Sequence, residues 1–336
     1  MIKVAIAGFG NIGQVRAKEL DKNENTKLVA IYDIKKPDNL NEDIKFCESF
    51  EELLKEDIDA VFVCAFNNVL ADFTNQALSA GKHVFCEKPP ARTSAELKSV
   101  METEKQSDLV LKYGFNHRYH YSVIEAKKII DSGVMGKLLW LRGVYGKAGS
   151  IDYHKNWRNY QKYSGGGILI DQGIHMLDLM RYFSGQKFEH INSFITTSYW
   201  DIEAEDNAFA IMQSDDKVTA MLHSSATQWK HKFLLEMCFE KGSINLDGIL
   251  SGTRSYAPEK LIVARREHEE LKFAMGKPQE TITTFEYDDS WKLEVEEFVG
   301  AILDKQSIKN GTSQDAYETL RLVERIYENS GFYSDK

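Results

Sequence analysis

The sequence lacks several features that would place it in a specialised class of protein. No apolar run is long enough to span a membrane, and the first residues enter an apolar segment without the pattern of a secretory signal peptide. Positive charge is in deficit, because 42 Lys and Arg stand against 51 Asp and Glu and leave a net charge of −9. This balance does not favour a nucleic acid or a membrane surface as partner, although a local basic patch remains compatible with it.

Cysteine is scarce as well. The four cysteines are Cys47, Cys64, Cys86 and Cys238. No two of them have Cys-x-x-Cys spacing, and Cys64 and Cys86 lie in apolar, strand-like runs. We expect buried, reduced thiols in a cytoplasmic protein, and neither a disulfide framework nor a zinc site.

The chain shows neither internal repeats nor low-complexity tracts. It has 336 residues, of which 43% are hydrophobic and 28% charged, as is ordinary for a globular protein with a sizeable core. This length favours two domains over one.

The most informative stretch is a glycine-rich turn near the N-terminus. An apolar run at residues 4–7 leads into Gly8, Gly10 and Gly13 with Gly-x-Gly-x-x-Gly spacing, and a helical segment follows. The first glycine permits the tight turn, the second lets a pyrophosphate approach the backbone, and the third lets helix and strand pack closely. The next predicted strand ends in Asp33, where an acidic side chain accepts hydrogen bonds from an adenosine ribose. The pattern predicts a dinucleotide site.

Charge at the end of the second strand bears on the choice of cofactor. Asp33 would repel the 2′-phosphate of NADP, which favours NAD. Lys35 and Lys36 follow immediately and are able to hold such a phosphate, so NADP remains the alternative.

The order of predicted elements indicates two kinds of domain. Strands and helices alternate over residues 1–118, which predicts an α/β Rossmann domain with a doubly wound parallel sheet. Residues 119–336 contain helices and a series of strand-like segments, with a hairpin turn at residues 214–217. We expect an α+β domain with a mostly antiparallel open sheet, and the terminal helices are able to pack back on the first domain.

A lysine follows the predicted strand at residues 83–86. Lys88 stands in Glu87-Lys88-Pro89, at the carboxyl end of a strand where a nicotinamide ring is expected. A lysine fixed there can donate to the oxygen of a secondary alcohol and stabilise alkoxide character as hydride leaves. The alternative interpretation is a solvated surface lysine.

A second candidate cluster follows a run of three glycines. On a helix, Asp171, His175 and Asp178 fall within an arc of roughly 60°. A histidine with carboxylates one turn away on each side suits a general base. Singly, they are explained as a helix cap, a core histidine and a surface charge, and one His with two Asp is also able to bind a metal ion. A nicotinamide enzyme that carries a lysine does not require a metal, so we expect none.

Two further segments carry candidate substrate ligands. Asn116 and Arg118 follow the last strand of the first domain, where pockets tend to form. Trp157 and Arg158 precede the glycine run, and an aromatic face beside a bidentate donor suits a polyhydroxylated or phosphorylated ligand. Surface packing is the alternative interpretation of these residues. Arg118, Lys155 and Arg158 hint weakly at an anionic substrate such as a nucleotide sugar.

These motifs, in this order, resemble the Gfo/Idh/MocA oxidoreductase family, which includes glucose–fructose oxidoreductase and inositol dehydrogenases. The resemblance runs over nearly the whole chain and is carried by four stretches, with a weaker match at residues 205–207. The four stretches are residues 8–13, 80–89, 114–119 and 165–178. One departure is Ala65-Phe-Asn67 with Leu70, where the family often has Thr-Pro-Asn and a later histidine.

The resemblance implies a role for each candidate residue. His175 would be the acid/base, and Asp171 and Lys88 would polarise the substrate oxygen. The residues expected to bind the cofactor are Gly8, Phe9, Gly10, Asn11, Ile12, Gly13, Asp33, Ala65, Asn67, Glu87 and Lys88. Those expected to bind substrate are Lys88, Asn116, Arg118, Trp157, Arg158, Asp171 and His175.

The resemblance also implies an activity and an assembly. Members oxidise or reduce a hydroxyl of a sugar, inositol or nucleotide sugar with NAD or NADP, and their open sheet face commonly forms a dimer or tetramer. We therefore expect an NAD(P)-dependent dehydrogenase that forms a homodimer or homotetramer. Two alternatives are a glycosidase or lyase that uses tightly held NAD in a transient oxidation, and a non-catalytic NAD-binding sensor.

Overall fold

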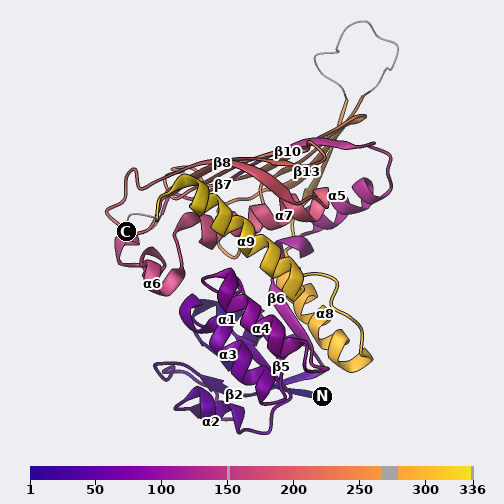
Figure 1. Cartoon of the computed structure of the whole chain (residues 1–336). Helices are drawn as coiled ribbons and strands as arrows, with labels where there is room; N and C mark the ends of the chain where they lie inside the picture. Colours follow the sequence, from indigo (N-terminus) through magenta and orange to yellow (C-terminus); the bar gives the residue numbers. More distant parts are fainter. Residues whose placement is uncertain (150–151, 267–278, 334–336) are drawn as a thin grey trace, which may run out of the picture. The chain divides into compact units, whose positions relative to one another are not determined.

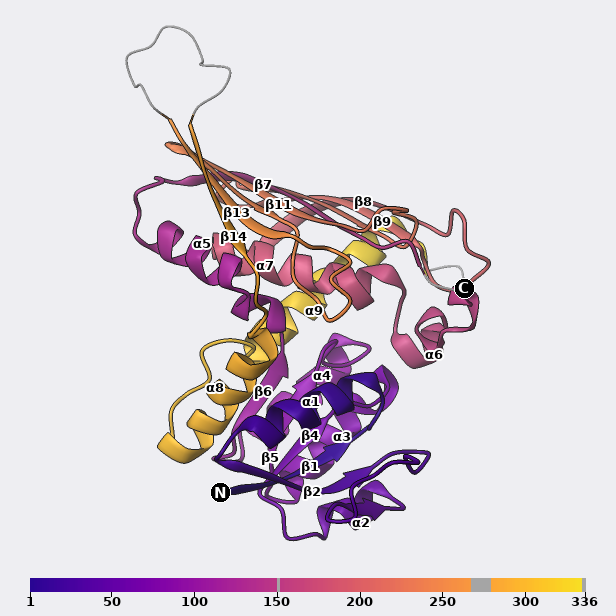
Figure 2. The same cartoon turned by 180° about the vertical axis from the view of Figure 1, so that it is seen from behind.

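The computed structural model describes residues 1–149, 152–266 and 279–333, and contacts divide the chain into two compact units (Figures 1 and 2). The first unit comprises Met1–Asn116, Lys162–Gly165 and Trp291–Arg321. The second comprises His117–Gln161, Gly166–Ser290 and Leu322–Lys336. Each unit is therefore assembled from segments that are discontinuous in sequence.

The first unit contains a six-stranded sheet in the order β3-β2-β1-β4-β5-β6, and every pairing in it is parallel. Its strands are β1 (Ile2–Ala7), β2 (Thr26–Tyr32), β3 (Lys45–Cys47), β4 (Ala60–Val63), β5 (His83–Glu87) and β6 (Leu111–Gly114). The predicted doubly wound parallel sheet is confirmed. The strand β3 was not expected, because three residues beside a polar loop give no periodic signal.

Helices connect these strands, as parallel pairing requires. They are α1 (Asn11–Lys22), α2 (Phe50–Leu54), α3 (Asn67–Ser79) and α4 (Ser94–Glu104). Ser49 caps α2 and Thr93 caps α4, each by accepting a hydrogen bond from the backbone N–H three residues on. Both segments, Ser49-Phe-Glu-Glu52 and Thr93-Ser-Ala-Glu96, have the capping-box pattern. Near the C-terminus lie α8 (Ser290–Asp304) and α9 (Ser313–Ser330).

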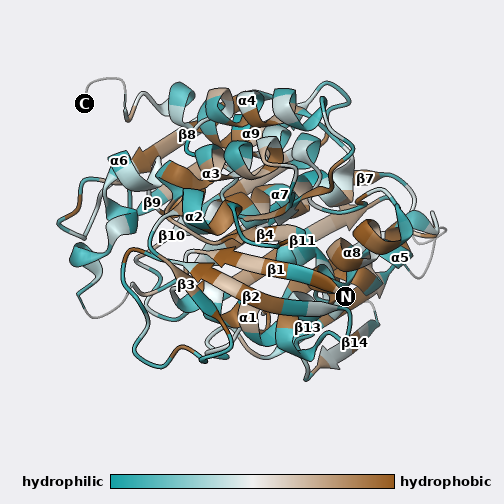
Figure 3. Cartoon of the chain, turned by 90° about the horizontal axis from the view of Figure 1, so that it is seen from below, coloured by the Kyte–Doolittle hydropathy of each residue, from teal (hydrophilic) through white to brown (hydrophobic). Residues whose placement is uncertain are grey.

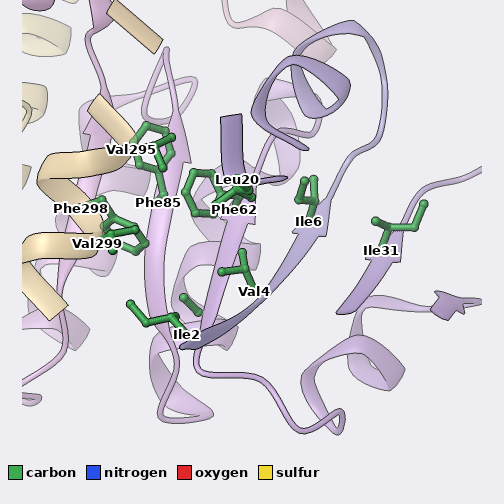
Figure 4. Close-up of a cluster of buried hydrophobic side chains, with 11 residues drawn as sticks. Ile2, Val4, Ile6, Leu20, Ile31, Phe62, Phe85, Val295, Phe298 and Val299 are labelled. Atoms are coloured by element: carbon green, nitrogen blue, oxygen red, sulfur yellow. The ribbon is translucent and has the colours of Figure 1, made fainter. Parts of the chain in front are cut away.

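The core of the first unit joins the sheet to α8 (Figure 4). Hydrophobic side chains dominate β1, as its colour shows in Figure 3. Phe62 of β4 stacks on Phe85 of β5 with ring centroids 4.7 Å apart. Phe298 of α8 meets both rings edge-on, at 5.4 Å and 5.7 Å. Its burial contributes about 2 kcal/mol or more to keeping α8 on this sheet.

The second unit contains an eight-stranded sheet in the order β14-β13-β12-β11-β7-β10-β9-β8. Only β7 and β10 pair in parallel, so the predicted mostly antiparallel sheet is confirmed. The strands are β7 (Leu138–Gly146), β8 (Phe188–Thr196), β9 (Asn207–Ser214), β10 (Thr219–Ser225), β11 (Lys232–Phe239), β12 (Gly242–Asp247), β13 (Glu259–Arg265) and β14 (Glu280–Phe285). The predicted hairpin joins β9 to β10, with Lys217 at φ 66°.

Helices α5 (Tyr121–Asp131) and α7 (Ile174–Ser184) lie along one face of this sheet (Figures 1 and 2). The shorter helices are η1 (Asn116–Tyr119), η2 (Tyr153–Lys155), η3 (Trp157–Asn159) and α6 (Gln161–Ser164), and most of α6 belongs to the first unit. A π-helical turn, η4 (Leu169–Gly173), precedes α7 directly. The helical spacing of Asp171, His175 and Asp178 gave no sign of this turn. No helix within the described residues is long and apolar enough to cross a membrane.

Candidate functional site

The glycine turn between β1 and α1 has the geometry that a dinucleotide requires. Gly8 has φ +92°, and a Cβ there would stand 2.5 Å from the Cys64 carbonyl oxygen. A Cβ at Gly13 would stand 2.1 Å from the Gly8 carbonyl oxygen, so helix and strand approach closely. In contrast, a Cβ at Gly10 would meet nothing within 4 Å. Gly10 is the N-cap of α1 and makes no side-chain cap, which leaves the first amides of the helix available to phosphates.

The acidic residue at the end of β2 lies beside this turn. Its Oδ2 accepts a hydrogen bond from the backbone N–H of Phe9 at 2.5 Å. Asp33 is thereby held at the turn, with its carboxylate in reach of a ribose bound there. Phe9, Asn11 and Ile12 form the turn itself and the start of α1. These residues fit an NAD molecule, because an open backbone cradle and a carboxylate converge on one place.

The loop after β4 is held by its own side chains. Asn67 is the first residue of α3, and its Nδ2 donates to the Ser164 carbonyl oxygen at 2.8 Å. Ala65 is partly exposed just before it. The amide of Asn67 therefore fixes the loop to α6, and direct contact of Ala65 or Asn67 with a cofactor remains a prediction.

At the end of β5, Glu87 belongs to a buried ionic cluster. The Nε of Arg16 donates to Glu87 at 2.7 Å, and Nη2 donates to Glu294 of α8 at 2.6 Å. The guanidinium also lies over the rings of Phe85 and Trp291, at 4.2 Å and 4.4 Å. Arg16 therefore holds Glu87 next to half-buried Lys88, and a direct contact of Glu87 with a cofactor remains a prediction.

Ionisation in this cluster is perturbed. Burial raises the pKa of Glu294 to about 7, against the opposing effect of Arg16. Burial acts to lower the pKa of Arg16, but Glu87 and Glu294 together raise it above its ordinary value. The guanidinium stays charged, and Glu294 becomes the group whose charge responds to pH near neutrality. The peptide bond between Lys88 and Pro89, which sequence left open, is cis.

The second unit brings Asp171 together with two cations. Asp171 lies in the π-helical turn, and its Oδ2 is 2.9 Å from Lys147 Nζ on the segment after β7. Its Oδ1 is 3.2 Å from Arg158 Nε. Asp171 and Lys147 retain 18% and 19% side-chain exposure, so the pair is reachable by a small molecule. The two cations hold the carboxylate of Asp171 in one orientation.

One turn along, His175 stacks on a second histidine. The rings of His175 and His117 are 3.8 Å apart at 17° to each other. His117 Nε2 lies 3.2 Å from the Tyr145 hydroxyl. Burial raises the pKa of Tyr145 well above its ordinary value, so the phenol stays protonated and available to the imidazole. The sequence did not predict Lys147, His117 or Tyr145 as site residues. His117 lies in the stretch at residues 114–119, but the other two lie in none of the four stretches.

Asp178, which the helical stripe placed on the same side as His175, is engaged by an arginine. Its two carboxylate oxygens accept from Nε and Nη2 of Arg118 at 2.8 Å and 2.7 Å. Both side chains are nearly inaccessible, with 3% and 1% exposure. The pair ties η1 to α7, and Arg118 is therefore better explained as a structural residue than as a substrate ligand.

The remaining predicted substrate ligands have different surroundings. Trp157 and Arg158 are both half-buried, and the guanidinium lies 4.5 Å from the Trp157 ring centroid. Asn116 is buried at the end of the first unit. Lys155 pairs with Asp152 on the surface. Arg158 also contacts Asp171.

The carboxylates that were also candidate metal ligands are paired with basic side chains. Asp178 is engaged by Arg118, and Asp171 by Lys147 and Arg158. Within the described residues, the group with metal-ligand spacing is Cys47, Glu52 and Glu56 in the first unit. Lys45 already bonds both of these glutamates, at 2.9 Å and 2.8 Å.

Comparison with known proteins matches both parts of the chain to one family. Residues 2–115 match the model described as an oxidoreductase family with an NAD-binding Rossmann fold. Residues 123–245 match the GFO/IDH/MocA C-terminal domain.

Individual relatives are similar over parts of their length. Myo-inositol 2-dehydrogenase of Thermotoga maritima is 29% identical over 196 residues, which is 56% of this chain and 57% of that protein. Levoglucosan dehydrogenase of Pseudarthrobacter phenanthrenivorans is 36% identical over 143 residues, 42% of this chain and 36% of that protein. The chain thus matches less than two thirds of the length of either relative.

A solved structure shares the fold of the whole chain. It is a levoglucosan dehydrogenase in complex with NADH, with a TM-score of 0.85 at 21% identity, and the match covers 98% of this chain and 97% of that chain. Because the family models match the parallel-sheet part and the part beyond it, the chain belongs to the GFO/IDH/MocA family of oxidoreductases, with an NAD-binding Rossmann domain at its N-terminus.

Proposed function

We propose that this protein is an NAD-dependent dehydrogenase that oxidises a secondary hydroxyl of a sugar or inositol. Its main support is that Asp171, held by two cations, precedes by one helical turn a histidine that stacks on a second ring. A base and an oriented carboxylate on adjacent helical turns suit proton abstraction from an alcohol. The relatives named above supply the class of substrate.

The chain's residues divide the work as follows. His175 accepts the proton that leaves the hydroxyl, and the stacked ring of His117 fixes the plane of its imidazole. Asp171 accepts a hydrogen bond from the substrate and orients it. Lys88 donates to the substrate oxygen and stabilises its developing negative charge. NAD, when bound, accepts the hydride.

The experiment begins with absorbance of reduced nicotinamide, measured with NAD and a panel of inositols, sugars, glycosides and nucleotide sugars. Net NADH formation supports a dehydrogenase. Product without net NADH would indicate a transient oxidation, and NAD binding without turnover of any compound would indicate a sensor.

Two substitutions then test the assignment of residues. We expect His175→Ala and Lys88→Ala each to lower kcat by about a hundredfold or more, because each removes a group that acts on the reacting oxygen. NAD affinity should change little, since neither residue lies in the glycine turn. The surface substitutions His154→Ala and Lys105→Ala are matched controls that should keep full activity. Wild-type turnover in either test variant would refute the role of that residue.

We also propose that two copies of the chain pair through the open face of the eight-stranded sheet. Large hydrophobic side chains stand exposed there, including Phe194 (76%), Ile211 (51%) and Phe209 (45%). Strand register places them on one face, because Phe194 pairs with Phe209, and Ile211 with Met221. Exposed apolar surface of this extent is typical of a protein interface.

The cytoplasm remains our proposed location for the protein. Its support is that all four cysteines are free thiols, as expected in a reducing compartment.

A further inference from the structure

Three successive glycines precede the π-helical turn, and the dehydrogenase proposal alone does not explain them. A Cβ at Gly167 would stand 2.2 Å from the Glu205 carbonyl oxygen and 2.8 Å from its carboxylate. A Cβ at Gly166 would stand 2.3 Å from the Tyr327 hydroxyl. These glycines therefore let one carboxylate and one phenol approach the backbone that leads to Asp171.

The carboxylate of Glu205 is fully buried and accepts four hydrogen bonds. The backbone N–H groups of Gly167 and Leu169 donate to it at 2.8 Å and 2.9 Å. The hydroxyls of Tyr327 and Tyr333 donate at 2.7 Å and 2.6 Å. Burial raises the pKa of Glu205, and these donors oppose that rise.

The backbone of Glu205 also bonds to the segment at residues 167–169. Its carbonyl oxygen accepts from the Ile168 N–H at 3.2 Å, so three amides at residues 167–169 are bonded to one residue. Amides at the start of a helix have no intrahelical partner and need such an acceptor. The Asp171 N–H donates to the Gly167 carbonyl oxygen at 3.0 Å, so the held segment carries Asp171 directly.

We propose that Glu205 is the positioning residue for Asp171, and that Tyr327 and Tyr333 hold its carboxylate in place. The effect of Glu205 on kcat, through the position of Asp171, rests on the proposed dehydrogenase function. It makes the C-terminal segment of the chain part of the active-site framework, since Tyr327 lies in α9 and Tyr333 follows it. Glu205 itself touches neither Lys147 nor Arg158, so its effect passes through the backbone.

The first test is Glu205→Gln. Oε2 of Glu205 accepts from the Gly167 N–H and the Tyr333 hydroxyl. In the variant, an amide NH₂ in that place is itself a donor and cannot accept these hydrogen bonds. We expect hydrogen exchange of the amides at residues 167–173 to accelerate about tenfold, with exchange in the parallel sheet unchanged. We expect kcat on the best sugar of the panel to fall by about ten- to a hundredfold, as for a misplaced catalytic group, with KM and NAD affinity within about twofold.

A milder variant guards against loss of folding. Tyr333→Phe removes one hydroxyl donor and keeps the ring, and we expect the same changes at about a third of the size. Tyr287→Phe, at a residue with 75% exposure, is the matched control and should behave as wild type.

Amide exchange needs no substrate, and Asp171→Asn, assayed alongside, tests the dehydrogenase proposal separately. Unchanged exchange at residues 167–173 in the Glu205 and Tyr333 variants would show that Glu205 does not hold the turn. Faster exchange with undiminished kcat would show that its role is stability alone, which also overturns the inference.

Discussion

At the scale of single residues, Asp33 lies beside the glycine turn, where its charge bears on the preference for NAD over NADP. Its carboxylate is held by the Phe9 amide, where the ribose of an adenosine would lie. We expect Asp33→Ala to weaken NAD binding by about tenfold and NADP binding much less, because it removes both a hydrogen-bond acceptor and a negative charge. Titration of each cofactor by fluorescence measures this. Equal losses for the two cofactors would contradict the preference for NAD.

A second residue-scale prediction concerns Glu294, whose pKa is raised from 4.5 to about 7 by burial. The folded protein then binds this proton more tightly than the unfolded chain. Its contribution to stability is fully present below pH 4.5 and is lost as pH rises through about 7. Over this pH range, this group should lower the free energy of unfolding of the wild type by an amount on the order of 3 kcal/mol, and Glu294→Gln should not show that decrease. Urea unfolding of both proteins at several pH values measures it, and parallel curves would refute it.

Several of these residues were predictable from sequence, and others were not. The glycines, Asp33 and Lys88 follow directly on strands that the apolar pattern reveals. The Arg118–Asp178 pair joins residues 60 positions apart, and Arg16 joins Glu294 across 278 positions, which no local pattern encodes. Without an alignment, only the fold brings such partners together.

At the scale of elements, the buried Arg118–Asp178 pair fixes α7 to η1. Breaking a buried ion pair leaves an uncompensated charge. We expect Arg118→Met to lower the free energy of unfolding by about 3–5 kcal/mol. The double variant Arg118→Met/Asp178→Leu should recover part of this loss. Thermal and urea unfolding provide the comparison, and a double variant no more stable than Arg118→Met would contradict this account.

Element type was better predicted than element detail. The alternation of strands and helices in the first domain and the mostly antiparallel sheet of the second were predicted correctly. The π-helical turn escaped prediction, and the bonds beside it join Gly167 and Leu169 to Glu205, 38 and 36 positions away, which no local pattern reveals. Strand β14 gives little hydrophobic signal, because Ile282 and Phe285 stand among a glutamate and threonines.

At the scale of the whole molecule, the open sheet face provides a prediction about assembly. We expect the wild-type chain to be a dimer or larger in light scattering. Phe194→Glu with Ile211→Glu should shift it towards monomer, because both charges would be buried in the proposed interface. A substitution at exposed Tyr287 serves as control, because this residue follows β14, which lies at the opposite edge of the sheet from β8. An unchanged mass for the double variant would exclude this face.

The role proposed for His175 is to take the proton from a sugar or inositol hydroxyl, with bound NAD as the acceptor of the hydride. Its most direct test is NADH formation by wild type and His175→Ala on the same substrate, with bound NAD measured in both. The account predicts net NADH from the wild type and a loss of about a hundredfold or more in the variant at unchanged NAD occupancy. Equal rates of NADH formation in the two proteins would contradict it.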